Sequence, residues 1–177
     1  ALASADPTPG GGAAAAMAAA MGCSLALMAA QTTVLKKATP QETKDRLARH
    51  IRKLGALKTQ LNNFIAEDGA AYSAFIVAKK LPKEDSDRPK AMEDALIYAA
   101  RVPVDTATTA IACLREIDLF KDLIAPVILS DIYCAQYLLK SAVRCCVENI
   151  RANLVFIQNE DWSKKLHQHI DVFLKSC

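Results

Sequence analysis

Residues 13–30 read AAAAMAAAMGCSLALMAA, and ten of these eighteen residues are alanine. The apolar run continues to Leu35, where Lys36 and Lys37 follow. A helix of this length is long enough to span a membrane. Alanine, however, gains only ~0.8 kcal/mol per buried carbon, and the polar residues 31–33 interrupt the end of the run. We therefore expect a buried helix of small side chains, against which other helices pack closely. Such a helix needs cover on every side, which one small domain can provide and a partner subunit would make easier.

The rest of the chain predicts further helices. Apolar residues recur at spacings of three and four between Pro40 and Pro82, and no stretch alternates with the period of two that is typical of strands. Glycine (6) and proline (7) are scarce, although Pro103 is expected to kink one helix. The predicted helices cover residues 41–80, 89–116, 126–158 and 161–176. We predict one all-α domain over residues 1–177: a dimeric bundle of five or six helices, several of them long. Because the first residue is Ala1, we expect the N-terminal end to be trimmed.

Composition excludes several classes of function. Hydrophobic residues make up 52% of the chain, which excludes a disordered protein. The net charge is +3 and the Lys and Arg residues are scattered, so we expect neither nucleic acid nor a membrane as a partner. Six cysteines form no Cys-x-x-Cys pair, and His167 and His169 face apart on a helix, so no metal site is predicted. Scattered cysteines in apolar runs are typical of a reducing compartment, which favours a cytoplasmic protein.

A glycine-rich segment, PTPGGG at residues 7–12, stands directly before the alanine run. The prolines prevent a helix there, and the next helix begins with unpaired N–H groups that suit an anion. The segment lacks the Gly-Lys-Ser/Thr ending of a P-loop, and no strand precedes it. Pro9, Gly10, Gly11 and Gly12 are therefore candidate ligand-binding residues. A flexible arm that leads into the helix is the alternative interpretation.

Asp68 is a candidate for acid–base chemistry. It lies on or beside the apolar stripe of the helix predicted over 41–80, and Tyr72 follows it by one turn. A carboxylate in such a position is either held by a partner or has its pKa shifted by burial. An inert, partly buried aspartate is the alternative.

A second set of polar residues lies on the helix predicted over 126–158. Asp131 and Asn149 are eighteen residues apart, which is five full turns, on a face that is otherwise rich in Leu, Ala and Cys. Polar groups on such a face need buried partners. They predict either hydrogen bonds between helices or the wall of a polar pocket.

Five motifs, in order, resemble those of the formimidoyltetrahydrofolate cyclodeaminase / methenyltetrahydrofolate cyclohydrolase family. PTPGGGAAA at residues 7–15 is similar to the family's opening PTPGGGSAA, and DGAAY at 68–72 with KLPK at 80–83 is similar to its D-x-x-A-F/Y and LPK segment. The other three are VPV at 102–104, SD at 130–131, and the N-I-x-x-N-L pattern at 149–154. The resemblance covers nearly the whole chain.

This resemblance implies an all-helical homodimer that binds a reduced folate in a cleft at or near the subunit interface, without a metal or redox cofactor. The cyclodeaminase closes 5-formimidoyltetrahydrofolate to 5,10-methenyltetrahydrofolate and releases ammonia. The catalytic carboxylate of these enzymes falls on Asp68, as a general acid/base. The segment from Pro9 to Gly12 would then contact the folate, with Tyr72 and Asn149 beside it, and we hypothesise that Asp131 accepts hydrogen bonds from the pterin ring.

Three alternatives stay open at this point. The cyclohydrolase reaction, in which water opens the methenyl ring to 10-formyltetrahydrofolate, is nearly as well supported by the motifs. A diverged, non-catalytic folate-binding dimer is favoured by two departures from the family pattern: Ala13 replaces the serine after the glycines, and Ile124-Ala125 replaces a Gly-Asn pair. A membrane-embedded helical protein is the third, on the length of the alanine-rich helix alone.

Overall fold

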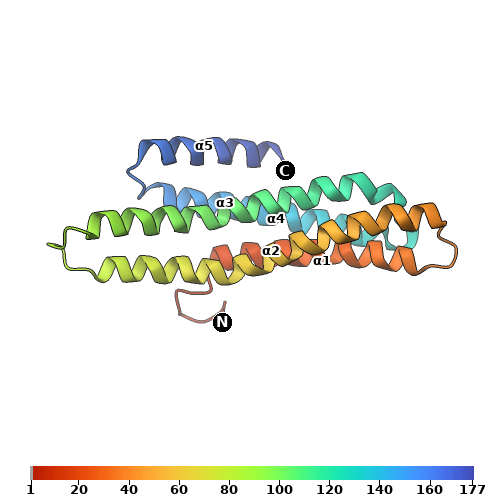
Figure 1. The fold of residues 1–177 in the computed structure, drawn as a ribbon, viewed down its shortest axis with the longest axis horizontal. Helices are drawn as coiled ribbons and strands as arrows, with labels where there is room; N and C mark the ends of the chain where they lie inside the picture. Colours follow the sequence, from red (N-terminus) through yellow and green to blue (C-terminus); the bar gives the residue numbers. More distant parts are fainter. Residues whose placement is uncertain (1) are drawn as a thin grey trace.

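The computed structural model describes residues 2–177, and it is a bundle of long helices (Figure 1). Within these residues the structure has five α-helices and no strand, which confirms the predicted all-α fold. The helices are α1 (Gly11–Leu35), α2 (Gln41–Lys80), α3 (Arg88–Phe120), α4 (Leu129–Leu154) and α5 (Glu160–Lys175), with short 3₁₀ turns η1 (Lys121–Leu123) and η2 (Pro126–Ile128) between α3 and α4. The first four lie along the long axis of the molecule, and α5 lies outside them, against α4 and α3 (Figure 1).

The alanine-rich helix α1 lies in the core, where α2, α3 and α4 pack against it. Twelve of its 25 residues are buried. Its small side chains let the neighbouring helices approach closely: a Cβ atom on Gly22 would lie 2.9 Å from the backbone oxygen of Ala135 in α4. Among residues 2–177, α1 alone is long and apolar enough to cross a membrane, a test that core helices also pass. Its burial matches the predicted packing of small side chains.

The boundaries of two helices differ from those predicted. Helix α3 extends to Phe120, because the fully buried Ile117 and Phe120 continue its core-facing stripe past the charged residues that suggested an end. Helix α4 ends at Leu154, four residues early, because the chain turns at Val155 and Phe156 before α5.

Pro103, the expected position of a kink, lies within α3, which continues through it without a break in helical structure. Proline has no N–H group, so the carbonyl of Ala99, four residues earlier, loses its helical hydrogen bond. Asn153 of α4 replaces that bond: its Nδ2 donates to the Ala99 oxygen at 3.1 Å. This contact ties α3 to the C-terminal end of α4.

An ion cluster around one buried carboxylate ties α2 to α3 in the other half of the bundle. The Glu116 carboxylate, almost completely buried, contacts His50 Nδ1 at 2.7 Å and Lys53 Nζ at 2.5 Å. Burial acts to raise the pKa of Glu116, but the hydrogen bonds and positive charges of Lys53 and His50 outweigh it and lower that pKa. Nothing in the sequence pattern predicted this cluster.

The helices are unequal in length, and this creates a step at one end of the bundle. Helix α2 has 40 residues and α1 has 25, so α2 is roughly 22 Å longer at 1.5 Å per residue. The excess lies where α2 runs into α3: the two project beyond the start of α1 and the end of α4 (Figure 1). The N-terminus of α1 therefore opens onto an exposed stretch of α2 and α3.

Candidate functional site

A cleft of about 320 Å³ lies at this step, around the N-terminus of α1. Its walls come from the segment before α1 and from α2, α3 and the end of α4. The glycine-rich segment and Asp68 are far apart in the sequence, and both line this cleft.

Asp68 caps the N-terminus of α1 from the neighbouring helix. Its Oδ2 accepts a hydrogen bond from the backbone N–H of Ala13 at 2.9 Å. The residue at the N-cap position of α1 is Gly10, which has no side chain to satisfy the first N–H groups. A carboxylate at this end of a helix is also stabilised by the helix dipole. The contact fixes the carboxylate at the floor of the cleft.

Gly12 makes this approach of Asp68 sterically feasible. A Cβ atom built on Gly12 would lie only 2.0 Å from Asp68 Oδ1. Any other residue at position 12 would therefore push the carboxylate out of its place. The third glycine of the segment is thus explained by the packing of α2 against α1.

Burial raises the pKa of the Asp68 carboxyl above its ordinary value, and the hydrogen bond from Ala13 opposes this only in part. No Lys or Arg side chain is among the described residues that line the cleft, so no neighbouring cation offsets the cost of burying the charge. A carboxyl with a raised pKa in a cleft is suited to accept and return a proton.

Amide and hydroxyl groups surround Asp68. The Nδ2 of Asn149 donates to the carbonyl of Cys145 at 2.8 Å, and its side-chain amide lies beside Gly11, where a Cβ atom would meet Asn149 Oδ1 at 3.1 Å. Tyr72, one turn after Asp68 on α2, lines the same cleft. The cleft thus presents a carboxylate, an amide and a phenol to a ligand.

Most of the predicted site residues come together here. The following predicted residues line the cleft: Gly10, Gly11, Gly12, Asp68, Tyr72 and Asn149. Pro9 lies between two lining residues, Thr8 and Gly10, but is not itself in the wall.

Asp131 does not line the cleft of its own chain. It stands in the first turn of α4, and Asn149 is near the end of that helix. Eighteen residues of helix separate them by roughly 27 Å, so the two side chains share a face but not a pocket. The hypothesis that Asp131 binds the pterin ring therefore stays a prediction, and it requires a second chain.

Two lining residues, Phe75 and Phe156, were not predicted, and Asn153 was placed in the N-I-x-x-N-L motif but not among the candidate site residues. The signal for Asn153 was present, because a proline inside a helix leaves a carbonyl without a partner and calls for a donor from another helix. Phe156 was assigned to the interior of a helix, and only the early end of α4 turns it toward the cleft.

The amino-acid sequence is similar to those of a family of enzymes and of several of its members. Residues 1–172 match the formiminotransferase-cyclodeaminase family. The chain is 40% identical over 115 residues to a methenyltetrahydrofolate cyclohydrolase of Methylorubrum extorquens, covering 64% of this chain and 53% of the relative. It is 30% identical over 176 residues to the formimidoyltransferase-cyclodeaminase of Mus musculus, covering 96% of this chain and 32% of the relative. It therefore spans about half the length of the first relative and about a third of the second.

The fold has also been seen before. A crystal structure of formiminotetrahydrofolate cyclodeaminase from Thermotoga maritima superimposes with a TM-score of 0.87 at 24% identity, covering 99% of this chain and 85% of that chain. At this identity the match shows a common fold. Together with the match over residues 1–172, it confirms the family that the motifs indicated: the chain belongs to the formiminotransferase-cyclodeaminase family.

Proposed function

We propose that this chain converts 5-formimidoyltetrahydrofolate to 5,10-methenyltetrahydrofolate and ammonia, with Asp68 as the general acid/base. The observation that carries the proposal is the placement of Asp68 at the floor of a cleft, held by Ala13 N–H and with its pKa raised by burial. Membership of the family supplies the substrate class, a one-carbon unit on a reduced folate.

The chemistry needs one group that moves protons. The substrate reacts with its formimidoyl group protonated, as N5–CH=NH2⁺. The folate N10 attacks the carbon of this group and loses its proton, and the former imino nitrogen, now NH2, must gain a proton before it leaves as ammonia and the methenyl cation remains. Asp68 would take the first proton and return it to the leaving nitrogen. Because both steps are proton transfers around one carbon, the proposal includes no metal or redox cofactor.

The electrostatics of the cleft suit such a substrate. Protonated formimidoyl and methenyl groups both carry a positive charge, and the described lining residues include the Asp68 carboxylate but no Lys or Arg. The first N–H groups of a helix have no partner within the helix. The N–H of Ala13 is taken by Asp68, which leaves those of Gly11 and Gly12 for a carbonyl or anionic part of the folate.

The proposal includes a homodimer that forms through the exposed face of α1. Met17, Met21 and Met28 follow one another along this face, and Met21 is 56% exposed. With Ile65 of α2 and Leu138 of α4 they line an apolar groove of about 470 Å³. Contiguous apolar surface of this kind is typical of an interaction site.

We expect the purified chain to sediment as a dimer, and Met21→Glu to sediment as a monomer, because a charge would be buried in the interface. Analytical ultracentrifugation measures both. Met21→Leu is the matched control, since it keeps the apolar volume and should keep the dimer. A wild-type chain that sediments as a monomer would contradict this part of the proposal.

A dimer would also give Asp131 access to a ligand. In an antiparallel pair across this groove, which Leu138 of α4 also lines, the Asp131 end of one α4 would lie toward the Asn149 end of the other. Each cleft would then receive Asp131 from the partner chain.

The cyclohydrolase reaction is the second candidate. The 40% identity to the Methylorubrum extorquens protein named for that reaction favours it. Both reactions pass through attack on the same carbon, and Asp68 would activate the water in this case.

One experiment separates these functions. The purified chain is mixed with 5,10-methenyltetrahydrofolate in one cuvette and 5-formimidoyltetrahydrofolate in another, and the near-ultraviolet absorbance of the methenyl product is followed. We expect a gain in the second cuvette together with ammonia. Loss in the first cuvette alone would identify a cyclohydrolase. No change in either, with folate binding still measurable by calorimetry, would indicate the non-catalytic binder.

A further inference from the structure

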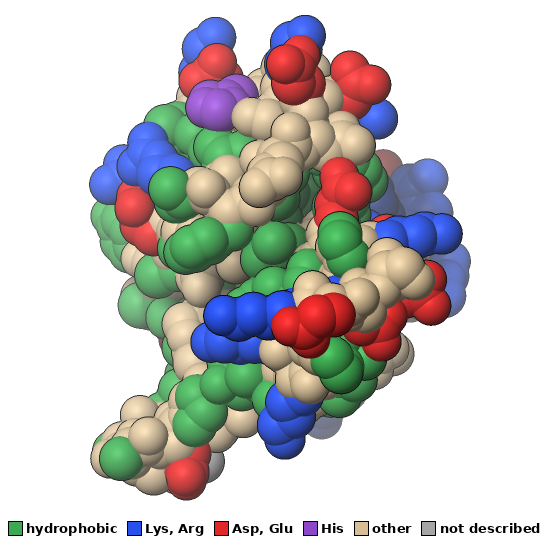
Figure 2. Space-filling model, turned by 90° about the vertical axis from the view of Figure 1, so that its left-hand side faces the viewer, with side chains coloured by type: hydrophobic (Ala, Val, Ile, Leu, Met, Phe, Trp, Pro, Cys, Tyr) green, Lys and Arg blue, Asp and Glu red, His purple; other side chains and the backbone are tan. Residues whose placement is uncertain are grey.

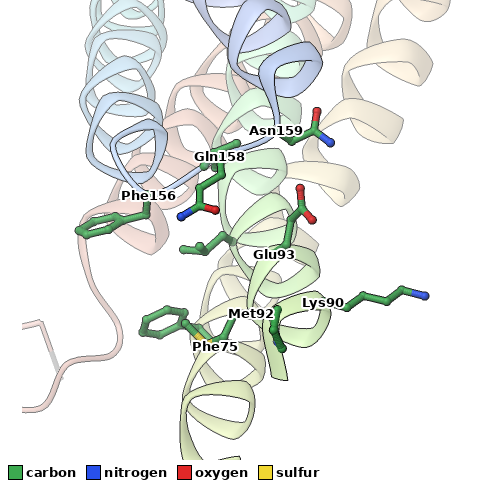
Figure 3. A pocket seen from close by; sticks show the side chains of 10 residues that line it. Phe75, Lys90, Met92, Glu93, Phe156, Gln158 and Asn159 are labelled. Carbon is green, nitrogen blue, oxygen red and sulfur yellow. The ribbon is translucent and has the colours of Figure 1, made fainter. Parts of the chain in front are cut away.

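The cleft around Asp68 opens into a second, larger pocket of about 730 Å³ (Figure 3). This pocket lies between the projecting ends of α2 and α3 and the connection from α4 to α5. The two share three wall residues, Phe75, Leu96 and Phe156. They therefore form one continuous depression, with the carboxylate at one end.

Two phenylalanines stand at the junction of the two pockets. Figure 3 shows Phe156, from the turn after α4, above Phe75 of α2, with both rings on the same side of the pocket. Met92 and Leu96 of α3 complete an apolar wall. We call this arrangement of Phe75, Phe156, Met92 and Leu96 the aromatic slot.

Hydrogen bonds fix the backbone at Phe156, although the side chain of this residue is 65% exposed. Its backbone N–H donates to the Asn153 carbonyl at 3.1 Å, and the N–H of the next residue, Ile157, donates to the Leu154 carbonyl at 3.2 Å. Ile157 itself is buried in the core. The turn therefore fixes the backbone position from which the aromatic ring of Phe156 reaches the pocket, and a ring placed at a pocket wall offers a flat apolar surface to a ligand.

The two adjoining pockets offer room for the two halves of a folate. A folate joins a pteridine to an aryl ring, which carries a glutamate. The cleft, at about 320 Å³, is near the lower limit of roughly 300–1,000 Å³ for pockets that enclose drug-sized ligands. It has room for the pteridine, and the aromatic slot directly adjoins it.

Charge does not define this second pocket. The side chains of Lys90 and Glu93, of opposite charge, both lie away from the two rings (Figure 3). Viewed onto this end of the bundle, basic and acidic side chains alternate around patches of hydrophobic ones (Figure 2). Recognition here depends on apolar and aromatic contact.

We propose that the aromatic slot binds the p-aminobenzoyl ring of the folate, between Phe75 and Phe156, while the pteridine occupies the cleft at Asp68. This inference rests on the proposed function, since it takes the ligand from it. It assigns to Phe156 a role in the affinity for the substrate and no role in the proton transfers.

The test compares two ligands in each variant by calorimetry: 5-formyltetrahydrofolate, and 6-methyltetrahydropterin, which lacks the aryl ring and glutamate. We expect Phe156→Ala to weaken binding of the folate by ~10-fold, as for loss of an aromatic stacking partner, and to weaken binding of the pterin by much less, because Phe156 stands at the edge that the cleft shares with the slot. Val155→Ala is the matched control, because Val155 precedes Phe156, is 78% exposed and is not in the pocket wall. It should change neither affinity.

Phe75→Leu provides a second variant, which keeps the apolar contact but removes the ring. It should also lower the ratio of folate affinity to pterin affinity. An equal loss for both ligands, or no loss for either, would overturn the proposal and leave the proposed function intact. A wild-type chain that binds neither ligand would overturn both. The ratio of the two affinities within one variant does not depend on the fraction of folded protein.

Discussion

Replacing Asp68 with asparagine should lower turnover by about 100-fold or more, the range for loss of a general acid/base, while the midpoint of thermal unfolding stays the same or rises. An asparagine oxygen can still accept the hydrogen bond from Ala13 N–H, so the cap on α1 is kept. The buried negative charge, whose cost raises the pKa of Asp68, is removed. Steady-state kinetics and circular dichroism melting measure the two quantities.

Asp68→Ala separates the two roles of this residue. It removes the cap as well as the carboxyl, so it should lose turnover to the same extent and also lower stability by ~0.5–2 kcal/mol, as other lost helix caps do. If Asp68→Asn turned over substrate at the wild-type rate, Asp68 would be a helix cap and nothing more.

The pH dependence of stability in wild type and Asp68→Asn gives a further check. The pKa of Asp68 is raised above its ordinary value of 3.8, so the folded state binds a proton more tightly than the unfolded state. The stability that Asp68 contributes is therefore present in full at low pH and is lost as pH rises through the raised pKa. As pH rises through this raised pKa, the melting temperature of Asp68→Asn should therefore increase relative to that of wild type. In wild type, kcat/KM should fall as pH falls below the same pKa, because Asp68 must be ionised to take the proton.

Gly12→Ala should also reduce turnover by about 100-fold, although it touches no reacting group. The new Cβ atom would meet Asp68 Oδ1 at 2.0 Å, and the easiest relief is rotation of the Asp68 side chain out of its position. Stability should change little, because alanine in a helix gains ~0.5–1 kcal/mol over glycine and offsets part of the lost contact with Ala13. The same kinetic and melting measurements apply.

Gly55→Ala is the matched control for this substitution. Gly55 lies within α2 and a Cβ atom there would meet nothing within 4 Å, so it should only raise stability. The double variant Gly12→Ala/Asp68→Asn should be no slower than Asp68→Asn alone, because both changes remove the same function. A Gly12→Ala enzyme that behaves like Gly55→Ala, with full activity, would show that the position of Asp68 is not critical.

The sequence predicted the helices well because the apolar spacing reports the buried face of each helix directly. It predicted Asp68 and the glycines as separate candidates, since a carboxylate on an apolar stripe and a glycine run before a helix are each unusual by themselves. What joined them was the resemblance to a family, and the structure adds the contact between Asp68 and Ala13.

The rest depends on which helix ends lie side by side, and this is not encoded in local spacing. The periodicity placed Asp131 and Asn149 on one face, but it carries no information on how far along the bundle a pocket extends. The cluster of His50, Lys53 and Glu116 was missed for a related reason: its members come from two helices, and Glu116 follows His50 by 66 residues in the sequence. Phe156 was missed because four residues of predicted helix do not form.

The step left by the short α1 makes the position of the Asp68 carboxylate independent of the size of the adjoining pocket. The carboxylate sits where four helices meet, whereas the aromatic slot depends on how far α2 and α3 extend beyond them. Removing or adding one helical turn where α2 connects to α3 would change the length of the projecting part by roughly 5.4 Å without moving Asp68. The length of α2 and α3 thus sets the size of the ligand that fits, and this length can change in evolution while the reacting centre stays constant.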